Sequence, residues 1–353
     1  MDVVIVRSRF GGVLGELGEM IADSMRTLGA DVGVCDSRDD AVRDGRVVLL
    51  LGAGPEFDAA LTSAASLGIK SPRVVLWGLD PLPPPDVIAE GGAAGMTAGR
   101  RLGRLRRLDQ RTGSLLGPSG RFGAVRRAAR AAAVGMARVG SPMPREMAFA
   151  FERLAWLESA VSAGRIHRVL VSSASSVRSL AARGISSELA TVRFHPSMGR
   201  NLHHERDIDV IFLGTTLDSR ADRIARLEAQ FQAAGVRLVQ VDRAYFGEER
   251  AALLNRCRVS VNVHKFPWHL ERIRFHLSMA CGAAVVSELP VPDLEPFVVG
   301  RHLLAAPLED LGATVLELLA DEPRRLAIAE NASRLIEDQE PDLRAVAEQI
   351  LVA

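Results

Sequence analysis

Side chains that could bind an anion are concentrated in residues 262–287, in the second half of the chain. A β-branched run ends at Asn262 and His264, and a helical pattern begins near Leu270 after a short loop. The first turn of such a helix has N–H groups without intrahelical partners and carries a partial positive charge. We therefore expect a phosphate or a diphosphate to bind beyond the end of the strand.

Three cations in the same stretch strengthen this expectation. Lys265, Arg272 and Arg274 can donate charge-assisted hydrogen bonds to phosphate oxygens. Gly282 can adopt the left-handed conformation that ends the helix before the next strand begins. The stretch therefore predicts a strand, a loop, a helix and a second strand built around an anion site.

A glycine-rich stretch follows the first predicted strand, Val3–Arg7, and opens a helix predicted over Leu14–Leu28. The backbone at Gly11 and Gly12 can approach a ligand closely because these residues have no side chain. Asp36 ends the second predicted strand, as in dinucleotide-binding folds, but the G-x-G-x-x-G spacing is absent. An NAD-dependent oxidoreductase is therefore the less favoured alternative.

Short β-branched runs alternate with longer helical patterns along much of the 353-residue chain. This alternation is typical of parallel sheets covered on both faces by helices. Because it occurs in both halves, we predict an α/β protein with two Rossmann-like domains and a ligand cleft between them. We place the domains at residues 1–194 and 195–338, and a C-terminal helix at residues 339–353.

The alternation is interrupted by a proline-rich run at residues 81–85 and by an insert at about residues 89–145. Within residues 100–130 there are ten arginines and one acid, Asp109, a difference of +9. Two interpretations stay open: a solvated helix or loop enriched in Arg by codon usage, or an anion-facing lid or surface for an acidic partner. Too few aromatic residues interleave to predict stacking on single-stranded nucleic acid.

The composition argues against several classes of function. Lys and Arg number 44 against 43 Asp and Glu, so the net charge of +1 gives no bulk basicity for binding nucleic acid. Cys35, Cys257 and Cys281 are widely separated, and their spacing predicts neither a metal site nor a disulfide framework. No stretch approaches the ~20 apolar residues of a membrane span, and no signal-peptide pattern opens the chain. We expect a reduced, cytoplasmic protein.

The run Arg274–Ala283, R-F-H-L-S-M-A-C-G-A, resembles the R-F-E-A-L-A-C-G-A signature of the GT-B glycosyltransferases. It is most similar to the CgeB-like branch of the group 1 glycosyltransferases. The resemblance extends to further stretches in order, namely residues 209–216, Arg220, residues 262–264, residues 293–300 and residues 319–329. It covers roughly the C-terminal half, whereas the first half is similar only in its strand–helix layout and in residues 77–81.

This resemblance implies a GT-B fold, with an acceptor site in the N-terminal domain and a nucleotide-diphosphate sugar in the C-terminal domain. It implies transfer of a sugar to an acceptor hydroxyl or amine. No cofactor or metal is implied, because a helix dipole and cations can neutralise the leaving diphosphate. The last helix of such enzymes commonly crosses back to the first domain, as residues 342–351 could here.

The resemblance also implies roles for individual residues. Gly214 and Thr215 would let backbone amides approach the diphosphate, and Arg220 would neutralise it. Asn262 and His264 would line the base or the ribose. The implied donor-binding set is Gly214, Thr215, Arg220, Asn262, His264, Lys265, Glu271, Arg274 and His276. The loop that contains Arg9, Gly11 and Gly12 would face the acceptor or the donor phosphates.

One position departs from the signature, since His276 stands where the family has a Glu that typically contacts a ribose hydroxyl. A His can hydrogen-bond a hydroxyl, but it accepts fewer bonds than a carboxylate and can become protonated. Glu271, about one turn earlier, could take over that contact. Either His276 contacts the donor or it is a helix residue satisfied by a neighbour. The replacement of Glu by His also motivates an alternative function, a catalytically inactive GT-B-like binding or scaffold protein.

An inverting transferase needs a general base for the acceptor hydroxyl. Asp80, after the strand predicted at Val74–Trp77, is the first candidate, and the alternative is an Asp-Pro turn former. His167 and His195 are weaker candidates. A retaining enzyme would need no such base, and the sequence does not decide between the two.

Two other polar patterns have a structural explanation. Ser172 and Ser173 follow a predicted strand and precede a helix, where N-capping accounts for them. Asp207 and Asp209 match a metal-binding D-x-D pattern, but they lie at the start of a predicted strand, the wrong end for a ligand site.

Overall fold

The computed structural model describes residues 2–7, 13–36, 45–67, 72–89, 145–215, 220–241, 245–338 and 343–352. Arg9, Gly11, Gly12 and the arginine-rich residues 100–130 lie outside the described residues, so the roles predicted for them stay predictions. The chain divides into two compact units. The first contains Met1–Phe10 and Ala30–Ala190, and the second contains Gly11–Gly29 and Thr191–Val352.

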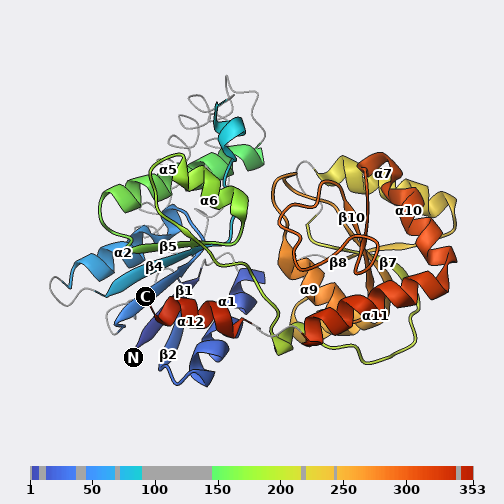
Figure 1. Ribbon diagram of the computed structural model, residues 1–353, viewed down its shortest axis with the longest axis horizontal. Coiled ribbons are helices and arrows are strands. Elements are labelled where there is room, and N and C mark those ends of the chain that lie inside the picture. The colour runs from blue at the N-terminus through green and yellow to red at the C-terminus, as the bar shows by residue number, and fades with distance from the viewer. Residues whose placement is uncertain are drawn as a thin grey trace, which may run out of the picture. The chain divides into compact units, whose positions relative to one another are not determined.

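The first unit is built on a six-stranded parallel sheet in the order β2-β1-β3-β4-β5-β6 (Figure 1). Its strands are β1 (Val3–Arg7), β2 (Val32–Asp36), β3 (Val47–Leu51), β4 (Arg73–Gly78), β5 (Arg168–Val171) and β6 (Glu188–Leu189). Neighbouring strands run in register, and Ile5 pairs with both Val34 and Leu49. Because β1 lies between β2 and β3, the crossover direction reverses at this strand.

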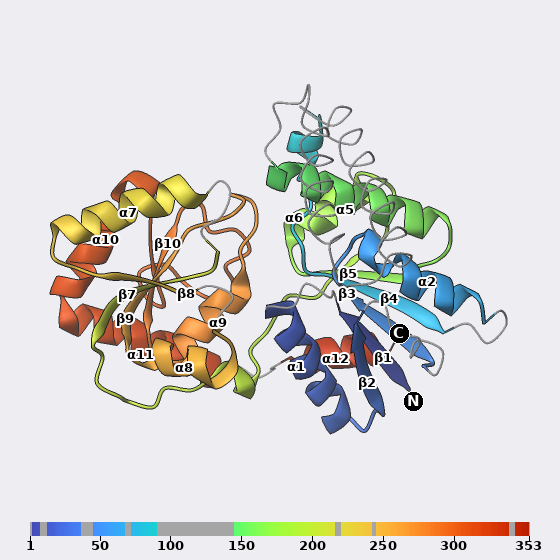
Figure 2. The ribbon, with the colours of Figure 1, turned by 180° about the vertical axis from the view of Figure 1, so that it is seen from behind.

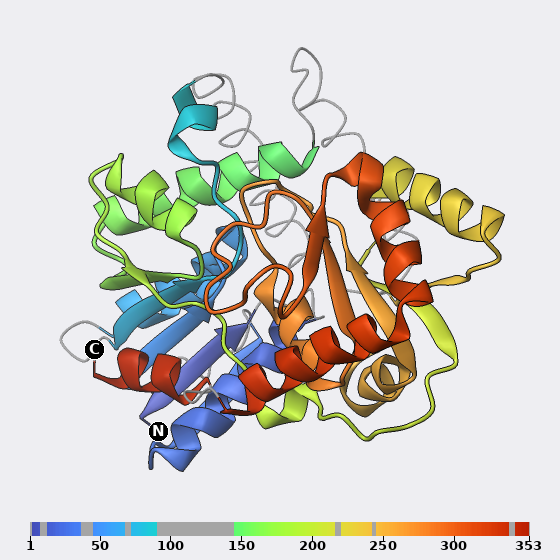
Figure 3. The same cartoon turned by 45° about the vertical axis from the view of Figure 1, so that its right-hand side comes forward.

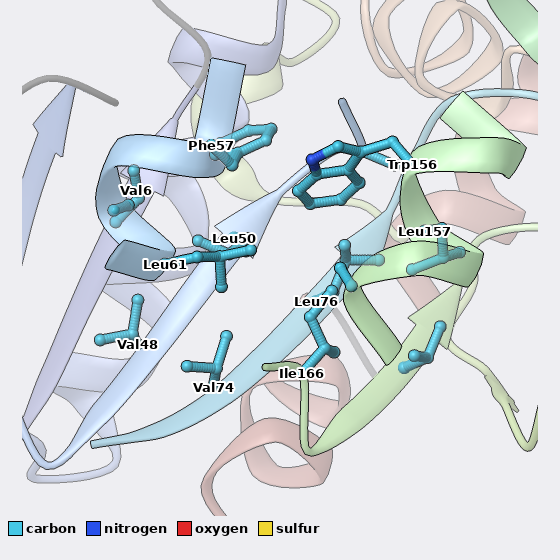
Figure 4. Packing of buried hydrophobic residues seen from close by; sticks show 14 of the residues in the cluster. Val6, Val48, Leu50, Phe57, Leu61, Val74, Leu76, Trp156, Leu157 and Ile166 are labelled. Carbon is cyan, nitrogen blue, oxygen red and sulfur yellow. The ribbon is translucent and has the colours of Figure 1, made fainter. Parts of the chain in front are cut away.

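Alternate residues of these strands pack against helices α2 (Asp58–Ala65), α5 (Arg145–Ser162) and α6 (Ala174–Ala181). Figure 4 shows Leu50 and Leu76 in the same apolar cluster as Phe57 and Trp156. The rings of Phe57 and Trp156 lie 6.2 Å apart. Burial of each large apolar side chain contributes about 1.5–3 kcal/mol, so this cluster anchors the helices to the sheet.

The second unit contains a five-stranded parallel sheet in the order β11-β10-β9-β7-β8. Its strands are β7 (Ile208–Leu213), β8 (Leu238–Val241), β9 (Cys257–Asn262), β10 (Ala284–Glu288) and β11 (Leu304–Ala306). The side chains of successive residues alternate between the two faces of the sheet, so Val285 and Val286 belong to different apolar clusters.

Helices cover both faces of this sheet (Figure 2). On one face, α7 (Ala221–Ala233) and α10 (Leu308–Ala320) bury residues such as Leu227 and Val315 against the strands. On the other, α9 (Arg272–Ala280) and α11 (Glu322–Asp338) pack together (Figure 3). Helix α8 (Gly247–Asn255) contacts β9 and α9.

The second unit also includes α1 (Val13–Thr27), although this helix follows β1 in the sequence. Helix α12 (Arg344–Leu351) packs along α1. Glu16 of α1 accepts hydrogen bonds from the Gly247 N–H and from Arg250 Nη1, both at 2.6 Å. A charged pair with a 2 % exposed arginine therefore joins α1 to the start of α8.

The predicted α/β class with parallel sheets is confirmed, and most predicted strands and helices are present. The sequence did not predict α2 or the short strands β6 and β11 at the ends of the two sheets. Gly282 has a φ of +74° and follows Cys281, the C-cap residue of α9, as expected for the glycine that ends this helix.

Candidate functional site

The strand order of the second sheet marks one edge as the place for a ligand. Since β7 lies between β8 and β9, the chain crosses the sheet in opposite directions before and after β8. Ligands of open α/β sheets bind beyond the carboxyl ends of the strands at such a switch point. Gly214 and Thr215 follow β7, and Asn262 ends β9, so the topology brings predicted site residues to this edge.

Gly214 lies directly beneath the guanidinium of Arg274. The φ of Gly214 is +141°, and a β-carbon at this position would lie 2.9 Å from Arg274 Nη2 and 3.0 Å from Cζ. Only glycine therefore allows this approach without displacing the arginine. Within the described part of the chain, the buried Nη1 of Arg274 has no hydrogen-bond partner. A buried donor without an acceptor is costly, which suits a group that binds an anion.

Arg220 lies at the start of α7, immediately before Ala221. Its Nη2 donates to Thr215 Oγ1 at 3.1 Å, and its guanidinium lies 5.6 Å from the centre of the Phe212 ring. The residue is only 3 % exposed. The charge is therefore held close to the backbone that follows β7.

Glu271 is the N-cap residue of α9, but its side chain makes no capping hydrogen bond. Instead, its carboxylate pairs with Arg274, three residues along the helix. Burial alone would raise the pKa of Glu271, but the positive charges of neighbouring side chains lower it to about 2. These neighbours, in order of decreasing effect, are Arg274, Arg220, His269 and Lys265.

We call Lys265, Arg220 and Arg274 the cation cluster. They come from the loop after β9, the start of α7 and the first turn of α9, and all three act on Glu271. His269, from the same loop as Lys265, lies near this carboxylate as well and was not predicted from the sequence. The cluster therefore lies at the switch point, where the sequence placed the diphosphate.

Asn262 and His264 use their polar atoms to join β9 to β10. Asn262 Nδ2 donates to Ser287 Oγ at 3.0 Å. The His264 N–H donates to Glu288 Oε2 at 2.9 Å, and His264 Nε2 lies 2.8 Å from the Glu288 carbonyl oxygen. Burial lowers the pKa of His264, with a smaller opposing effect from Glu288. The structure thus gives both side chains a bridging role, and their predicted contact with base or ribose stays a prediction.

Arg223 and Glu288 complete this arrangement and were missed in the sequence. Arg223 Nη1 lies 3.0 Å from both carboxylate oxygens of Glu288, and its Nη2 donates to the His264 carbonyl at 2.6 Å. The pair holds the loop that follows β9 in place. No motif marks these two residues, which are 65 positions apart.

His276 is buried on the face of α9 that packs against Phe297, with a ring-centre distance of 5.8 Å. Burial, followed by the charges of Arg272 and Arg193, lowers the pKa of His276 to about 3. The imidazole is therefore neutral near pH 7. Its buried Nδ1 has no hydrogen-bond partner among the described residues.

Arg272, the other arginine in the first turn of α9, has a different environment from Arg274. Its guanidinium donates to the carbonyl oxygens of Asp293 and Glu295 and lies 5.8 Å from the centre of the Phe297 ring. Arg272 therefore fixes the loop after β10, and Arg274 is the arginine that enters the cation cluster.

Comparison with known proteins shows what the chain is similar to. Residues 216–352 match the family model described as glycosyl transferase-like. Among solved structures, HepE of Anabaena in complex with UDP-glucose has a TM-score of 0.55 at 12 % identity, over 99 % of this chain and 98 % of that one. The T4 phage β-glucosyltransferase with UDP-glucose also gives 0.55, at 10 % identity over 100 % and 98 %.

A third structure, WaaG, a glycosyltransferase involved in lipopolysaccharide biosynthesis, has a TM-score of 0.58 at 12 % identity, over 99 % of this chain and 98 % of that one. The protein has the GT-B glycosyltransferase fold. The predicted resemblance to GT-B glycosyltransferases is confirmed, while nothing in these comparisons tests the CgeB-like branch. No curated protein matches the sequence of the chain.

In the first unit of this GT-B protein, Asp80 lies beyond the carboxyl end of β4. Asp80 Oδ1 is 3.1 Å from Arg153 Nη2 of α5, and Oδ2 lies 3.5 Å from the Ala53 N–H. A β-carbon on Gly52, whose φ is +108°, would lie 3.2 Å from Oδ2. The Asp80 carboxylate is thus held by Arg153 of α5 and by the backbone after β3. A residue that only forms an Asp-Pro turn would not need these contacts.

The weaker histidine candidates of the GT-B protein both have local partners. His167 Nδ1 accepts a hydrogen bond from the Val74 N–H at 2.9 Å. His195 Nδ1 accepts one from the Ser197 N–H at 3.2 Å, and its Nε2 lies 3.3 Å from Asp23.

The remaining polar side chains singled out in the sequence make structural contacts. Ser173 caps α6, as predicted, by accepting from the Ser176 N–H at 3.2 Å. Asp207 and Asp209 lie at the start of β7 and pair with Arg256 and Arg258. Asp36 pairs with Arg7 at 3.1 Å.

Two kinds of feature are absent from the described residues of this GT-B protein. No three or more His, Cys, Asp or Glu side chains come together there in a way that could hold a metal ion. Nor does any helix in that part of the chain have the length and apolarity needed to cross a membrane.

Proposed function

We propose that this protein transfers a sugar from a nucleotide-diphosphate sugar to an acceptor hydroxyl or amine, with the diphosphate bound by the cation cluster. The observation that carries the proposal is the position of Arg274, a half-buried arginine over Gly214 at the switch point, whose buried Nη1 has no acceptor in the described part of the chain. HepE and the T4 phage enzyme are each recorded with UDP-glucose, which makes UDP and UDP-glucose suitable probes.

In the proposed reaction, the bond between the anomeric carbon and the diphosphate oxygen breaks, and the oxygen keeps the electron pair. Lys265, Arg220 and Arg274 stabilise the negative charge that develops on the leaving diphosphate. This charge neutralisation comes from side chains, so the proposal needs no divalent metal at this position.

The acceptor oxygen or nitrogen forms the new bond to the anomeric carbon and loses a proton. In an inverting reaction we assign this proton to Asp80, with Arg153 orienting its carboxylate. A retaining reaction would make Asp80 dispensable, so a substitution at this position distinguishes the two stereochemical courses.

A second candidate function is nucleotide-sugar binding without transfer. It is favoured by one observation, the neutral, buried His276 at the position where the family signature has Glu. Release of UDP from UDP-glucose separates the two candidates, since a transferase usually hydrolyses some donor without an acceptor. Sustained UDP release supports transfer, whereas binding without release supports the second candidate.

The binding half of the proposal is tested by titration calorimetry with UDP. We expect R274A and K265A each to weaken UDP binding by about tenfold or more, because each removes a full charge from a partly buried anion site. Arg334→Ala is the matched control, since Arg334 is 63 % exposed on α11 and pairs only with Glu330 among the ion pairs of the described residues. Unchanged UDP affinity in both R274A and K265A would overturn the proposal.

A further inference from the structure

An acid, Glu271, lies beside the cation cluster, and its position affects which ligand the site binds more tightly. Glu271 is the N-cap residue of α9, but its carboxylate makes no capping hydrogen bond. The carboxylate pairs with Arg274 instead. Arg274 is in turn held against Gly214. Any phosphate that accepts a hydrogen bond from Arg274 therefore lies close to a carboxylate.

The charges of these side chains suit one kind of diphosphate better than another. Lys265, Arg220 and Arg274 with Glu271 carry a net formal charge of +2, three cations against one carboxylate. The diphosphate of a nucleotide sugar is a diester and carries about two negative charges. Once the sugar has left, the terminal phosphate is no longer esterified and gains up to about one more charge, since its second pKa is near 6.

We propose that Glu271 is a specificity-determining residue that makes the site favour the nucleotide sugar over the free nucleoside diphosphate. The inference rests on the proposed function, because it assumes that a diphosphate binds at Arg274. Like charges at short distance repel in a partly buried site, so the carboxylate disfavours the extra charge of the product. Glu271 therefore promotes product release and limits product inhibition.

The test compares the affinities of UDP and UDP-glucose for the wild-type protein and for E271Q, by calorimetry at pH 7.5. Glutamine keeps the size of the side chain and removes its charge. We expect the affinity for UDP to rise at least about threefold more than the affinity for UDP-glucose. An equal change for both ligands, or a larger gain for UDP-glucose, would overturn the inference.

The chain provides a matched control for this substitution. Glu322 begins α11 and pairs with Arg325 three residues later, as Glu271 pairs with Arg274. Arg325 interacts with Arg258 and Cys257 at the start of β9, the opposite end of that strand from Asn262. E322Q should leave the affinities for UDP and for UDP-glucose unchanged. If the ratio of these two affinities changes threefold in E322Q, the result with E271Q no longer supports the inference.

A measurement on the wild-type protein keeps the inference testable even if E271Q fails to fold. The methyl ester of UDP on its terminal phosphate has the charge of the diester but no sugar to bind. We expect it to bind at least as tightly as UDP, and a UDP affinity several-fold higher than that of the ester would contradict the role of Glu271. If the wild type binds none of the three ligands, the proposed function itself fails.

Discussion

The guanidinium of Arg274 and the α-carbon of Gly214 are so close that they leave no room for a β-carbon between them. A β-carbon on Gly214 would lie 2.9 Å from Nη2 of an arginine that is already paired with Glu271. A backbone position after β7 and a side chain on α9, sixty residues apart, thus define the surface on which we place the diphosphate.

Substitution of Gly214 by alanine should damage ligand binding more than stability. The positive φ costs an alanine about 1 kcal/mol, and the methyl group in addition displaces Arg274. We expect G214A to weaken UDP binding by about tenfold or more in calorimetry, because a displaced Arg274 guanidinium cannot donate its hydrogen bonds in the same direction.

Gly235 supplies the control for G214A. It follows α7 with a φ of +73°, and a β-carbon there would meet no atom within 4 Å. G235A should therefore show a similar backbone cost in thermal unfolding with unaltered UDP affinity. If G214A and G235A bind UDP equally well, Arg274 is not positioned by this contact in the way we describe.

Asp80→Asn separates chemistry from donor binding. If Asp80 takes the acceptor proton, D80N should lower sugar transfer or donor hydrolysis by about a hundredfold while changing UDP affinity by less than about twofold. The control is D58N, since Asp58 accepts a hydrogen bond from Trp156 Nε1 at 2.9 Å and pairs with Arg165 in the same unit. Turnover by D80N at the wild-type rate would exclude Asp80 as the base and would favour a retaining reaction.

His276 should make the stability of the protein depend on pH. Its pKa is about 3 in the folded protein, against 6.5 for an ordinary histidine, because burial disfavours the charged ring. Between these values the unfolded chain binds more protons, so stability falls as the pH decreases through this window. From pH 6.5 to pH 5 the loss due to His276 should reach about 2 kcal/mol.

Denaturant unfolding of H276Q at the same two pH values checks this expectation. The variant should lose less stability on acidification than the wild type, by the stated amount, whatever the glutamine itself costs at pH 7. Ser278, a non-titrating buried residue of the same helix, is the control position, and S278A should keep the wild-type pH dependence. If the free energy of unfolding of H276Q falls between the two pH values as much as that of the wild type, burial does not hold the His276 ring neutral.

Local patterns in the sequence were sufficient to predict most helices and strands. β-branched runs such as Val47–Leu51 form strands because their side chains pack on both faces of a buried sheet. The apolar spacing in α1 forms one buried stripe, and Gly282 ends α9 because it can take a positive φ at little cost. The two-residue strand β6 is too short to show any such pattern.

The candidate site was predictable only in part, and Glu288 shows why. Its carboxylate binds Arg223, 65 residues earlier in the chain, and the His264 N–H, 24 residues earlier. These contacts exist because β9 pairs with β10 and α7 covers the same sheet. Neither the order of strands nor the placement of a helix on a face is encoded in local periodicity.

The amino-acid sequence alone determined the α/β class and the resemblance to GT-B glycosyltransferases, and it predicted the stretch in which an anion would bind. These depend on residue types and short spacings, which persist whatever the rest of the chain does. Only the tertiary structure decided that Arg274 and not Arg272 joins Lys265 and Arg220, and that Glu271 lies among them. The direction of each side chain follows from packing against elements distant in the sequence, and that packing exists only in the folded chain.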